Sequence, residues 1–406
     1  MRILFVSQLF DPENSIKGLE FAKRLQALGH EVEVITTFPS YPGGKIFPGY
    51  RMRWQQVEEI DGVRIVRLPT IISHGRSAVK RMLSYASFGV VSSIHALFFA
   101  RKADVIYAYY PPVIVGFAAM LVRFFRRTPF VYDVQDLWPE ALVATGMVRE
   151  GRITRFVDRL CGLIYRSASR VVVLSDGYQR ALESKKTPRE KIKRIFNWCD
   201  EGRTAVVAEQ NAPVLDSGYF NVLYAGNMGA AQALSHVVDA AALVEKNGVD
   251  KIRFVFLGAG VECDTLKHRV SELGLCNVRF LPQVTVDKVS GILAAADVLL
   301  VHLADAKVFE ITIPSKTQAY MKTGRPILMA VKGEAADIIV DAQAGVVVEP
   351  CQPRKLADAV LQMFALPRAE LDEMGRRGRH YYTEKMSMEN GVRQIDSMLR
   401  QVVENT

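Results

Sequence analysis

Residues 312–331 read TIPSKTQAYMKTGRPILMAV, and the order of residue types in this stretch predicts a loop, a helix and a strand. Ser315 suits the start of the helix, and Gly324 suits its end. Lys316 falls in the first turn, where unpaired backbone amides make the helix end positive. The stretch is therefore one helix-to-strand unit with a cation at an end that already favours anions, which suits a bound anion. A lysine whose flexible side chain points into solvent is the alternative.

The same alternation of short apolar runs and helical patterns continues along the chain, which is typical of parallel sheets covered by helices on both faces. In the first half, runs rich in β-branched residues predict strands at 2–8, 31–38, 63–70, 104–110, 129–136, 170–175 and 192–198. In the second half they predict strands at 220–226, 252–258, 278–283, 297–303, 325–331 and 345–350. We therefore expect an α/β protein with two doubly wound Rossmann-like domains that face a central cleft.

The length of the chain also favours two domains, because 406 residues exceed what one hydrophobic core usually spans. The strand pattern lapses between 201 and 218, which we interpret as the linker. The N-terminal domain is then expected at 1–200 and the C-terminal domain at 219–383. A terminal amphipathic helix is expected at 384–406.

The composition is that of a soluble globular protein, with 49% hydrophobic and 23% charged residues. The five cysteines show no C-x-x-C pair and no zinc spacing, which fits free thiols in a reducing compartment. The N-terminal run is typical of a core strand and lacks the features of a signal peptide. We expect a cytoplasmic protein.

The positive charge is concentrated in the first half of the chain. Residues 1–200 contain 30 Lys and Arg against 18 Asp and Glu, whereas residues 201–406 contain 22 against 25. This asymmetry indicates an anionic membrane surface or a nucleic acid as partner, with a solvated basic face as the alternative. Nucleic acid is disfavoured because the basic residues are dispersed without interleaved aromatic residues.

Residues 82–100 carry no formal charge and nearly reach the length of a membrane span. Four serines and His95 lower the hydrophobicity of this segment. We expect a helix packed on the first sheet or lying on the membrane surface, and the basic cluster at 123–127 is a second candidate membrane contact.

Two glycine turns support an anion site in the second half. LYAGNMGAAQ (223–232) and FLGAGVECD (256–264) each follow an expected strand and precede a helix, which suits approach of a phosphate to backbone amides. Glycines that only permit close packing are the alternative. A dinucleotide oxidoreductase is weakly supported, because Cys263 stands where G-x-G-x-x-G needs its third glycine.

Taken together, these motifs resemble the family 4 retaining glycosyltransferases of the GT-B fold. The resemblance is carried by LGHEVEVIT (28–36), PSYPGGKIFPGY (39–50), QDLWPE (135–140), VVLSDGYQRAL (172–182), NWCD (197–200), AGNMG (225–229), FLGAG (256–260), AAADV (294–298) and PSKTQAYMKTGRPIL (314–328). The combination is most similar to bacterial O-antigen and capsule transferases of the N-acetylfucosamine-transferase type. In that family the second domain binds a sugar nucleotide and the first binds an acceptor, often a polyprenyl-diphosphate-linked sugar. The resemblance also implies that the terminal helix at 384–406 crosses back to the N-terminal domain, with a dimer contact as the alternative.

The chain departs from the family pattern at several positions. Ala319 and Ile311 stand where many members have paired glutamates, and Glu310 lies one place away. Asn227 and Gln232 replace the usual arginine and lysine of the diphosphate site. The resemblance then implies that Lys316 is the leading phosphate cation, ahead of Lys307 and Arg325. The residues that it implies at the donor site are Gly18, Gly226, Asn227, Gly258, Gly260, Pro282, Ser315 and Lys316.

In the first domain, Gln135 and Asp136 take the place of a His-Asp pair that is common in the family. Asp136 is a candidate to contact a sugar hydroxyl, with helix capping as the alternative. The resemblance implies Asp136, Glu310 and Lys316 as catalytic candidates. Asn14, Ser15, Lys17 and Gln135 are candidates for the acceptor site, and Lys17 is also a candidate phosphate ligand from across the cleft.

The resemblance implies retaining transfer of a sugar, expected to be N-acetylated, from a nucleotide diphosphate donor to a lipid-linked acceptor. The protein would be associated peripherally with the inner face of the cytoplasmic membrane. We expect a UDP-sugar donor, no cofactor and no metal, since no D-x-D or H-E-x-x-H motif is present. A sugar-nucleotide 2-epimerase of the same fold and a non-catalytic scaffold of polysaccharide assembly are the alternatives.

Overall fold

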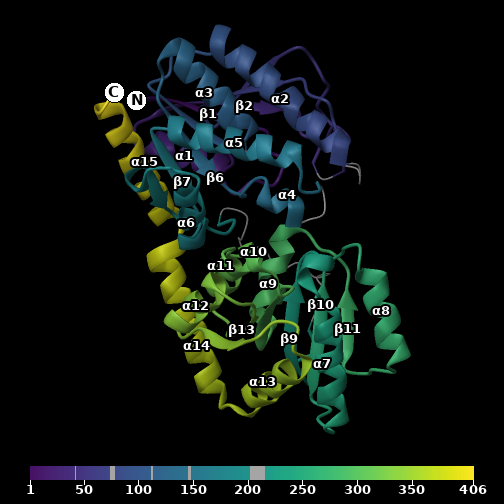
Figure 1. The fold of residues 1–406 in the computed structure, drawn as a ribbon. Helices are drawn as coiled ribbons and strands as arrows, with labels where there is room; N and C mark the ends of the chain where they lie inside the picture. Colours follow the sequence, from purple (N-terminus) through teal and green to yellow (C-terminus); the bar gives the residue numbers. More distant parts are fainter. Residues whose placement is uncertain (42, 74–77, 111–112, 145–147, 202–214) are drawn as a thin grey trace. The chain divides into compact units, whose positions relative to one another are not determined.

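The computed structural model describes residues 1–41, 43–73, 78–110, 113–144, 148–201 and 215–406 (Figure 1). The chain divides into two compact units. The first contains Met1–Phe196 and Gly391–Thr406, and the second contains Asn197–Asn390. Most of the expected linker, 202–214, lies outside the described residues.

The first unit is built on an eight-stranded sheet of order β3-β4-β2-β1-β5-β6-β7-β8. Its strands are β1 (Arg2–Ser7), β2 (Glu31–Thr37), β3 (Gln56–Ile60), β4 (Val63–Leu68), β5 (Val105–Tyr110), β6 (Phe130–Val134), β7 (Arg170–Val173) and β8 (Ile192–Arg194). All neighbours pair in parallel except β3, which is antiparallel to β4. The apolar runs form central strands because parallel sheets are buried on both faces.

Helices connect these strands: α1 (Leu19–Ala27), α2 (Ala78–Phe98), α3 (Ile114–Arg126), α4 (Glu140–Ala144), α5 (Arg152–Ser167), α6 (Asp176–Ser184) and the short helix η1 (Arg189–Lys191). Helix α15 (Met388–Glu404) ends the chain. His30 Nε2 lies 2.5 Å from Asp396 Oδ1, and Arg400 donates to the Leu28 carbonyl at 3.0 Å. These contacts fix α15 on the turn between α1 and β2, and Figure 1 shows both termini on this unit.

The second unit contains a fully parallel sheet of order β11-β10-β9-β12-β13-β14. Its strands are β9 (Phe220–Ala225), β10 (Ile252–Leu257), β11 (Val278–Leu281), β12 (Val298–His302), β13 (Ile327–Ala330) and β14 (Gly345–Val348). Its helices are η2 (Ala230–Gln232), α7 (Ser235–Lys246), α8 (Cys263–Glu272), α9 (Val286–Ala295), α10 (Lys307–Glu310), α11 (Ser315–Thr323), α12 (Glu334–Asp341), α13 (Pro353–Ala365), α14 (Arg368–Tyr381) and η3 (Tyr382–Met386).

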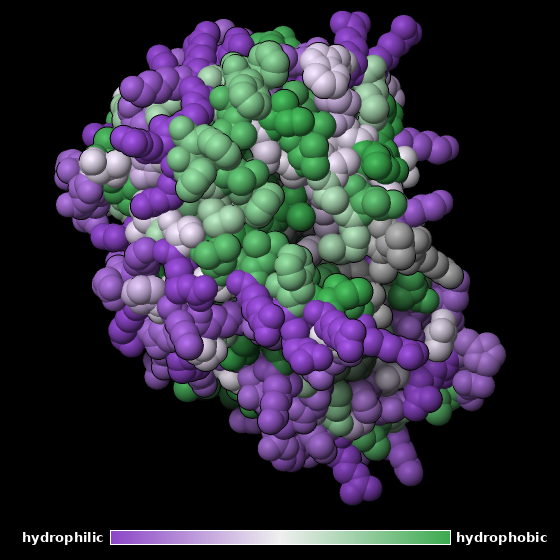
Figure 2. All heavy atoms as spheres, turned by 45° about the horizontal axis from the view of Figure 1, so that its top comes forward, coloured by the Kyte–Doolittle hydropathy of each residue, from purple (hydrophilic) through white to green (hydrophobic). Residues whose placement is uncertain are grey.

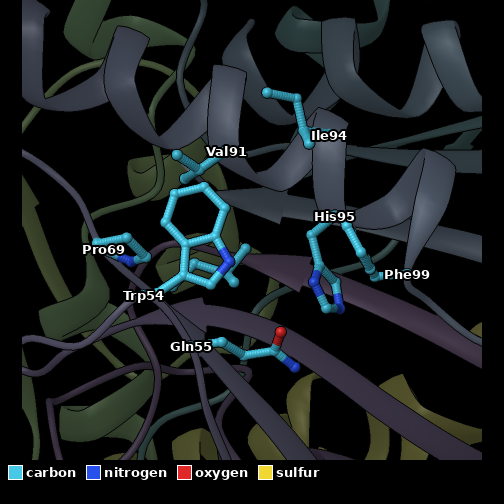
Figure 3. Close-up of a pocket in the computed structure, with 8 residues that line it drawn as sticks. Trp54, Gln55, Pro69, Val91, Ile94, His95 and Phe99 are labelled. Carbon is cyan, nitrogen blue, oxygen red and sulfur yellow. The ribbon is translucent and has the colours of Figure 1, made fainter.

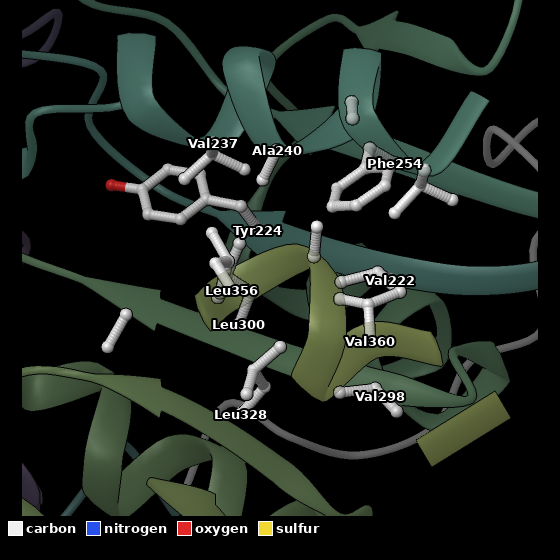
Figure 4. Close-up of a cluster of buried hydrophobic side chains, with 14 of the residues drawn as sticks. Val222, Tyr224, Val237, Ala240, Phe254, Val298, Leu300, Leu328, Leu356 and Val360 are labelled. Atoms are coloured by element: carbon white, nitrogen blue, oxygen red, sulfur yellow. The ribbon is translucent and has the colours of Figure 1, made fainter. Parts of the chain in front are cut away.

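Helices α7 and α13 cover one face of this second sheet. Val237 of α7 and Val360 of α13 lie in one buried cluster with Val222, Phe254 and Leu300 from three strands (Figure 4). Tyr224 belongs to the same cluster, and its hydroxyl lies at the cluster's edge. The packing therefore fixes the carboxyl end of β9.

The expected α/β class with two Rossmann-like sheets is confirmed. The expected strands all occur, and β3 is an additional one that the pattern did not predict. The segment between β12 and α11 contains the short helix α10, which the sequence pattern did not predict. The terminal α-helix begins at Met388, after the π-helical turn η3, and not at 384.

Candidate functional site

The candidate site lies at the carboxyl end of the second sheet, where the strand order changes direction. Strand β9 has β10 on one side and β12 on the other. Open parallel sheets bind ligands at such a switch point. Gly226 follows β9 directly and has a φ of +133°, a conformation that side chains strongly disfavour. The chain thus turns sharply away from the sheet with bare backbone at the expected ligand position.

Lys316 brings a cation to this turn. It is the second residue of α11, whose N-terminal cap, Pro314, provides no side-chain hydrogen bond. The Lys316 ammonium lies 4.8 Å from the centre of the Tyr224 ring. A Cβ added to Gly226 would lie 2.9 Å from Lys316 Nζ. Lys316 forms no ion pair with any described residue, so its charge has no protein counterion in this part of the molecule.

The surroundings of Lys316 penalise its charged form. Desolvation lowers the pKa of the ammonium to about 8. The Lys316 side chain therefore remains mostly protonated at neutral pH. Among the described residues, the Tyr224 ring faces its ammonium group and no carboxylate pairs with it. An anion bound beside Gly226 would restore the lost solvation and would also meet the positive end of α11.

Two tyrosines hold the turn in place. The Tyr320 hydroxyl of α11 accepts a hydrogen bond from Ala225 N–H at 2.9 Å and donates to the Ala225 carbonyl at 3.3 Å. The Tyr224 hydroxyl donates to the Asn227 carbonyl at 2.5 Å. Helix α11 is therefore tied to the end of β9 by Tyr320, which lies one helical turn after Lys316.

Gly258 and Gly260 support the turn from behind. A Cβ on Gly258 would lie 2.2 Å from the Gly226 carbonyl oxygen, and one on Gly260 would lie 2.2 Å from that of Met228. Both glycines are thus required for packing between two backbone segments, the alternative that the sequence left open. Pro282 follows β11 and is exposed.

Asn227 and Gln232, which replace the usual basic residues, bond to each other. Gln232 Oε1 accepts from Gly229 N–H at 3.0 Å and lies 3.3 Å from Asn227 Nδ2. The amide pair closes the turn, so these two positions stabilise the backbone here and leave the positive charge to Lys316.

His302 is a residue that the sequence reasoning did not single out. Its Nδ1 lies 2.7 Å from the Gln232 carbonyl, and its Nε2 accepts from Cys351 N–H at 3.3 Å. These partners require a neutral ring that donates from Nδ1. Burial lowers the pKa of His302 to about 4, which agrees with that tautomer. A histidine at the carboxyl end of an apolar strand was the available signal.

Glu310, a catalytic candidate, is the last residue of α10 and is exposed. Its backbone is packed closely, since a Cβ on Gly333 would lie 2.0 Å from the Glu310 carbonyl oxygen. No hydrogen bond or ion pair joins Glu310 to Lys316 within the described residues. Ser315 opens α11 and is also exposed. Among the predicted residues of the second unit, the fold therefore brings Lys316 and Gly258 against Gly226, and Lys316 is the charged one.

In the first unit, the structure gives Lys17 a different role from the predicted one. Lys17 Nζ lies 2.6 Å from Asp133 Oδ2, and neither side chain is exposed. Tyr107 donates to Asp133 at 2.5 Å, and Gln135 Nε2 donates at 2.6 Å. Lys17 is therefore not presented to a phosphate, and the Gln135 amide binds this buried cluster.

The other candidates of the first unit are placed near this cluster or at the surface. A Cβ on Gly18 would lie 2.2 Å from the Asp11 carboxylate, which already accepts from Leu19 N–H at 2.6 Å. Gly18 is thus needed for this local bond. Ser15 is hydrogen-bonded to Tyr109, and Asn14 is exposed. Asp136 is exposed and lies four residues before α4, so it does not cap that helix.

No group of three or more histidines, cysteines or carboxylates within the described residues is arranged to hold a metal ion. The site's positive charge, in the part of the chain that the structure describes, comes from Lys316 and the amides of α11.

Two family models match the two halves of the chain. Residues 19–198 match the "Glycosyl transferase 4-like domain", and residues 219–365 match "Glycosyl transferases group 1". The probable glycosyltransferase WbjE of Pseudomonas aeruginosa is 28% identical over 71% of this chain and 74% of its own length. The putative colanic acid biosynthesis glycosyl transferase WcaI of Escherichia coli K12 is 26% identical over 98% of this chain and 100% of its own.

The fold is also found in solved glycosyltransferase structures. Anabaena Alr3699/HepE, crystallised in complex with UDP, superimposes with a TM-score of 0.68 at 16% identity, over 99% of this chain and 100% of that one. The expected GT-B fold is thereby confirmed.

Proposed function

We propose that this chain, which belongs to the glycosyltransferases of the GT-B fold, transfers a sugar from a nucleotide diphosphate donor in the synthesis of a bacterial surface polysaccharide. The acceptor in this proposal is a polyprenyl-diphosphate-linked sugar. The transferred sugar is N-acetylated, and its anomeric configuration is retained.

The observation that carries the donor assignment is the contact between Lys316 and the Gly226 turn. A glycosyl transfer leaves negative charge on the departing diphosphate, and preorganised donors that meet this charge in a closed site accelerate the reaction. The Lys316 ammonium and the first amides of α11 supply such donors at the carboxyl edge of the sheet. The absence of a carboxylate partner for Lys316 among the described residues leaves the ammonium available to the diphosphate.

The names of the relatives support the polysaccharide context. WcaI is described as acting in colanic acid biosynthesis, and the HepE structure holds UDP. We therefore favour UDP as the nucleotide of the donor. A uridine nucleotide would place its diphosphate at the Gly226 turn.

The acceptor assignment is connected with the basic first half of the chain. A lipid-linked acceptor has to be reached at a bilayer, and a basic surface favours anionic headgroups. No helix among the described residues is long and apolar enough to cross a membrane. We propose that the first unit binds the membrane surface peripherally.

Binding of UDP tests the donor site. Isothermal titration of the metal-free protein should give a saturable signal with UDP, and Lys316→Ala should weaken binding by about 10- to 100-fold, because a hydrogen bond to a charged group contributes about 1.5–3 kcal/mol. Lys307→Ala is the matched control, since Lys307 lies in the same region and is exposed. Equal UDP affinity in wild type and Lys316→Ala would remove the basis of the proposal.

Product analysis tests the reaction. With a UDP-N-acetylhexosamine and a polyprenyl-diphosphate-sugar, the wild type should form a larger lipid-linked saccharide with the donor's anomeric configuration. Conversion of the donor to its 2-epimer without any acceptor would instead identify an epimerase.

A further inference from the structure

The first unit exposes many large apolar side chains on the helices that cover one face of its sheet. On α2, Leu83, Val90, Ile94 and Phe98 are 42–75% exposed and follow one another at spacings of seven, four and four residues. This spacing places them on one face of the helix. Figure 2 shows apolar side chains gathered in one area of the molecular surface, with hydrophilic side chains around it.

Helix α3 extends this exposed face. Arg126, the last residue of α3, donates to the carbonyls of Ala96 and Ala100 at 2.6 and 3.1 Å, so the carboxyl ends of α2 and α3 lie side by side. This end of the two helices carries four phenylalanines that are 64–78% exposed: Phe98, Phe99, Phe124 and Phe125. We call these four residues the phenylalanine end. Exposed patches of this kind mark interaction surfaces.

The residues around the phenylalanine end are basic. Lys102 and Arg127 follow the two helices and are exposed. Residues 51–54, RMRW, alternate two exposed arginines with Met52 and Trp54, and Trp54 is 76% exposed. None of these four basic side chains forms an ion pair with a described residue. Unpaired cations beside exposed aromatic residues complement an anionic bilayer, which offers headgroup charge above hydrocarbon.

A hollow opens in this face beside Trp54. It is a shallow cavity of about 30 Å³ that lies between α2 and the strands β3 and β4 (Figure 3). Its walls are formed by Trp54, Gln55, Leu68, Pro69, Val91, Ile94, His95 and Phe99. Figure 3 shows Trp54 beside Val91 and Pro69, with His95 and Phe99 on the opposite side.

The walls of the hollow select an apolar ligand. Gln55 and His95 are the two polar side chains that line it. Burial lowers the pKa of His95, and its ring stacks on Phe99 with centres 5.9 Å apart, so the histidine presents a neutral, largely apolar surface. A charged or strongly hydrogen-bonding ligand would lose its solvation here without finding partners.

We propose that a few methylene groups of one acyl chain of a bilayer phospholipid enter this hollow while the phenylalanine end inserts into the membrane interface. The inference rests on the membrane location proposed above and adds a defined chain-binding site to it. Hydrophobic contact, and not charge alone, then anchors the protein, because transfer of aromatic and aliphatic surface from water is favourable.

The fluorescence of Trp54 tests this site. The chain has three tryptophans, and the other two, Trp138 and Trp198, are 5% and 2% exposed. Vesicles of phosphatidylcholine with phosphatidylglycerol that carry brominated acyl chains should shift the emission to the blue and quench it. Trp54→Phe should lose both responses. Unchanged Trp54 emission on such vesicles would overturn the proposal.

Two variants separate the hollow from the surface around it. Leu68 lines the hollow and is 4% exposed, so Leu68→Phe should fill the hollow with little change to the surface. A soluble brominated fatty acid, below its micelle concentration, should quench wild-type Trp54 saturably and bind Leu68→Phe at least tenfold more weakly. Val91→Phe fills the hollow from α2 and replaces Leu68→Phe if that variant misfolds.

Phe124→Ser is the matched control for membrane insertion. It should bind vesicles several-fold more weakly but bind the soluble fatty acid as the wild type does. If Leu68→Phe and Val91→Phe both bound the fatty acid with wild-type affinity, the hollow would not be the binding site. If the protein bound an isoprenoid alcohol saturably but did not bind the straight-chain fatty acid, the assignment of an acyl chain as the ligand would be wrong. Neither readout depends on UDP or on turnover, so failure of the donor proposal would leave these results unaffected.

Discussion

Lys17 and Asp133 form an ion pair of 2.6 Å whose two side chains are both fully buried. The pair joins the loop after β1 to the end of β6, and Tyr107 and Gln135 complete the hydrogen bonds of the carboxylate. A buried pair of this kind is costly to break, because removal of one partner leaves the other charge without compensation.

We therefore expect Lys17→Met to reduce the free energy of unfolding by about 3–5 kcal/mol, the usual loss when one partner of a buried pair is removed. Urea denaturation followed by circular dichroism measures this difference. Lys23→Met is the control, because Lys23 is a half-exposed lysine of α1 that pairs with Asp61, and it should change stability little. Equal losses in the two variants would show that the buried pair is not a structural anchor.

The pKa of Lys316 predicts how donor affinity depends on pH. Desolvation lowers the pKa of Lys316 to about 8, so the free protein loses the ammonium charge as pH rises through this value. The terminal phosphate of UDP, whose second pKa is about 6, is already fully ionised in this range. UDP affinity should therefore fall with rising pH above about 8. Calorimetric titrations between about pH 7 and pH 9.5 measure this trend.

Lys316→Arg provides the control for that titration, because a guanidinium remains charged throughout the range. The variant should bind UDP with little dependence on pH. The assignment of the ammonium to the diphosphate would fail if wild type and Lys316→Arg showed the same decline.

The apolar pattern of the sequence was sufficient to predict the central strands. Strand β3 was missed because Gln56–Ile60 contains two glutamates and lies at the antiparallel edge of the sheet, where one side of the strand is solvated. Helix α10 was missed because four residues, Lys307–Glu310, are too few to give a helical period.

The candidate site was predictable where topology alone determines proximity. Lys316 and Gly226 follow neighbouring strands, β12 and β9, and the carboxyl ends of parallel strands meet at one edge. The role of Lys17 was not predictable, because its partner Asp133 lies within an apolar strand far away in the chain. Sequence spacing does not reveal which charged residues a fold buries together.

The close packing behind the Gly226 turn gives a prediction about glycines. Gly258 and Gly248 both have positive φ values, +136° and +75°. Only Gly258 lies against another backbone segment, because a Cβ added to it would lie 2.2 Å from the Gly226 carbonyl oxygen. Gly248 has no atom within 4 Å of an added Cβ. Gly258→Ala should therefore lower the melting temperature more than Gly248→Ala and should weaken UDP binding, because it displaces the turn. Differential scanning fluorimetry with and without UDP measures both effects. Equal behaviour of the two variants would contradict the packing role of Gly258.

His302 predicts a loss of stability in acid. Its pKa is lowered to about 4 in the folded protein, so between the ordinary value of about 6.5 and pH 4 the unfolded chain binds the additional proton. The stability contributed by the neutral ring is present above about pH 6.5 and is lost as pH falls, by at most about 3 kcal/mol.

His302→Gln isolates this contribution, because glutamine can donate to the Gln232 carbonyl but does not titrate. Urea denaturation at pH 7 and at about pH 4.5 should show a smaller acid-induced loss for the variant than for the wild type. His268→Gln, at a side chain that is 74% exposed, should keep the wild-type loss. A wild-type pH dependence in His302→Gln would mean that the neutral imidazole does not stabilise the segment around Gln232.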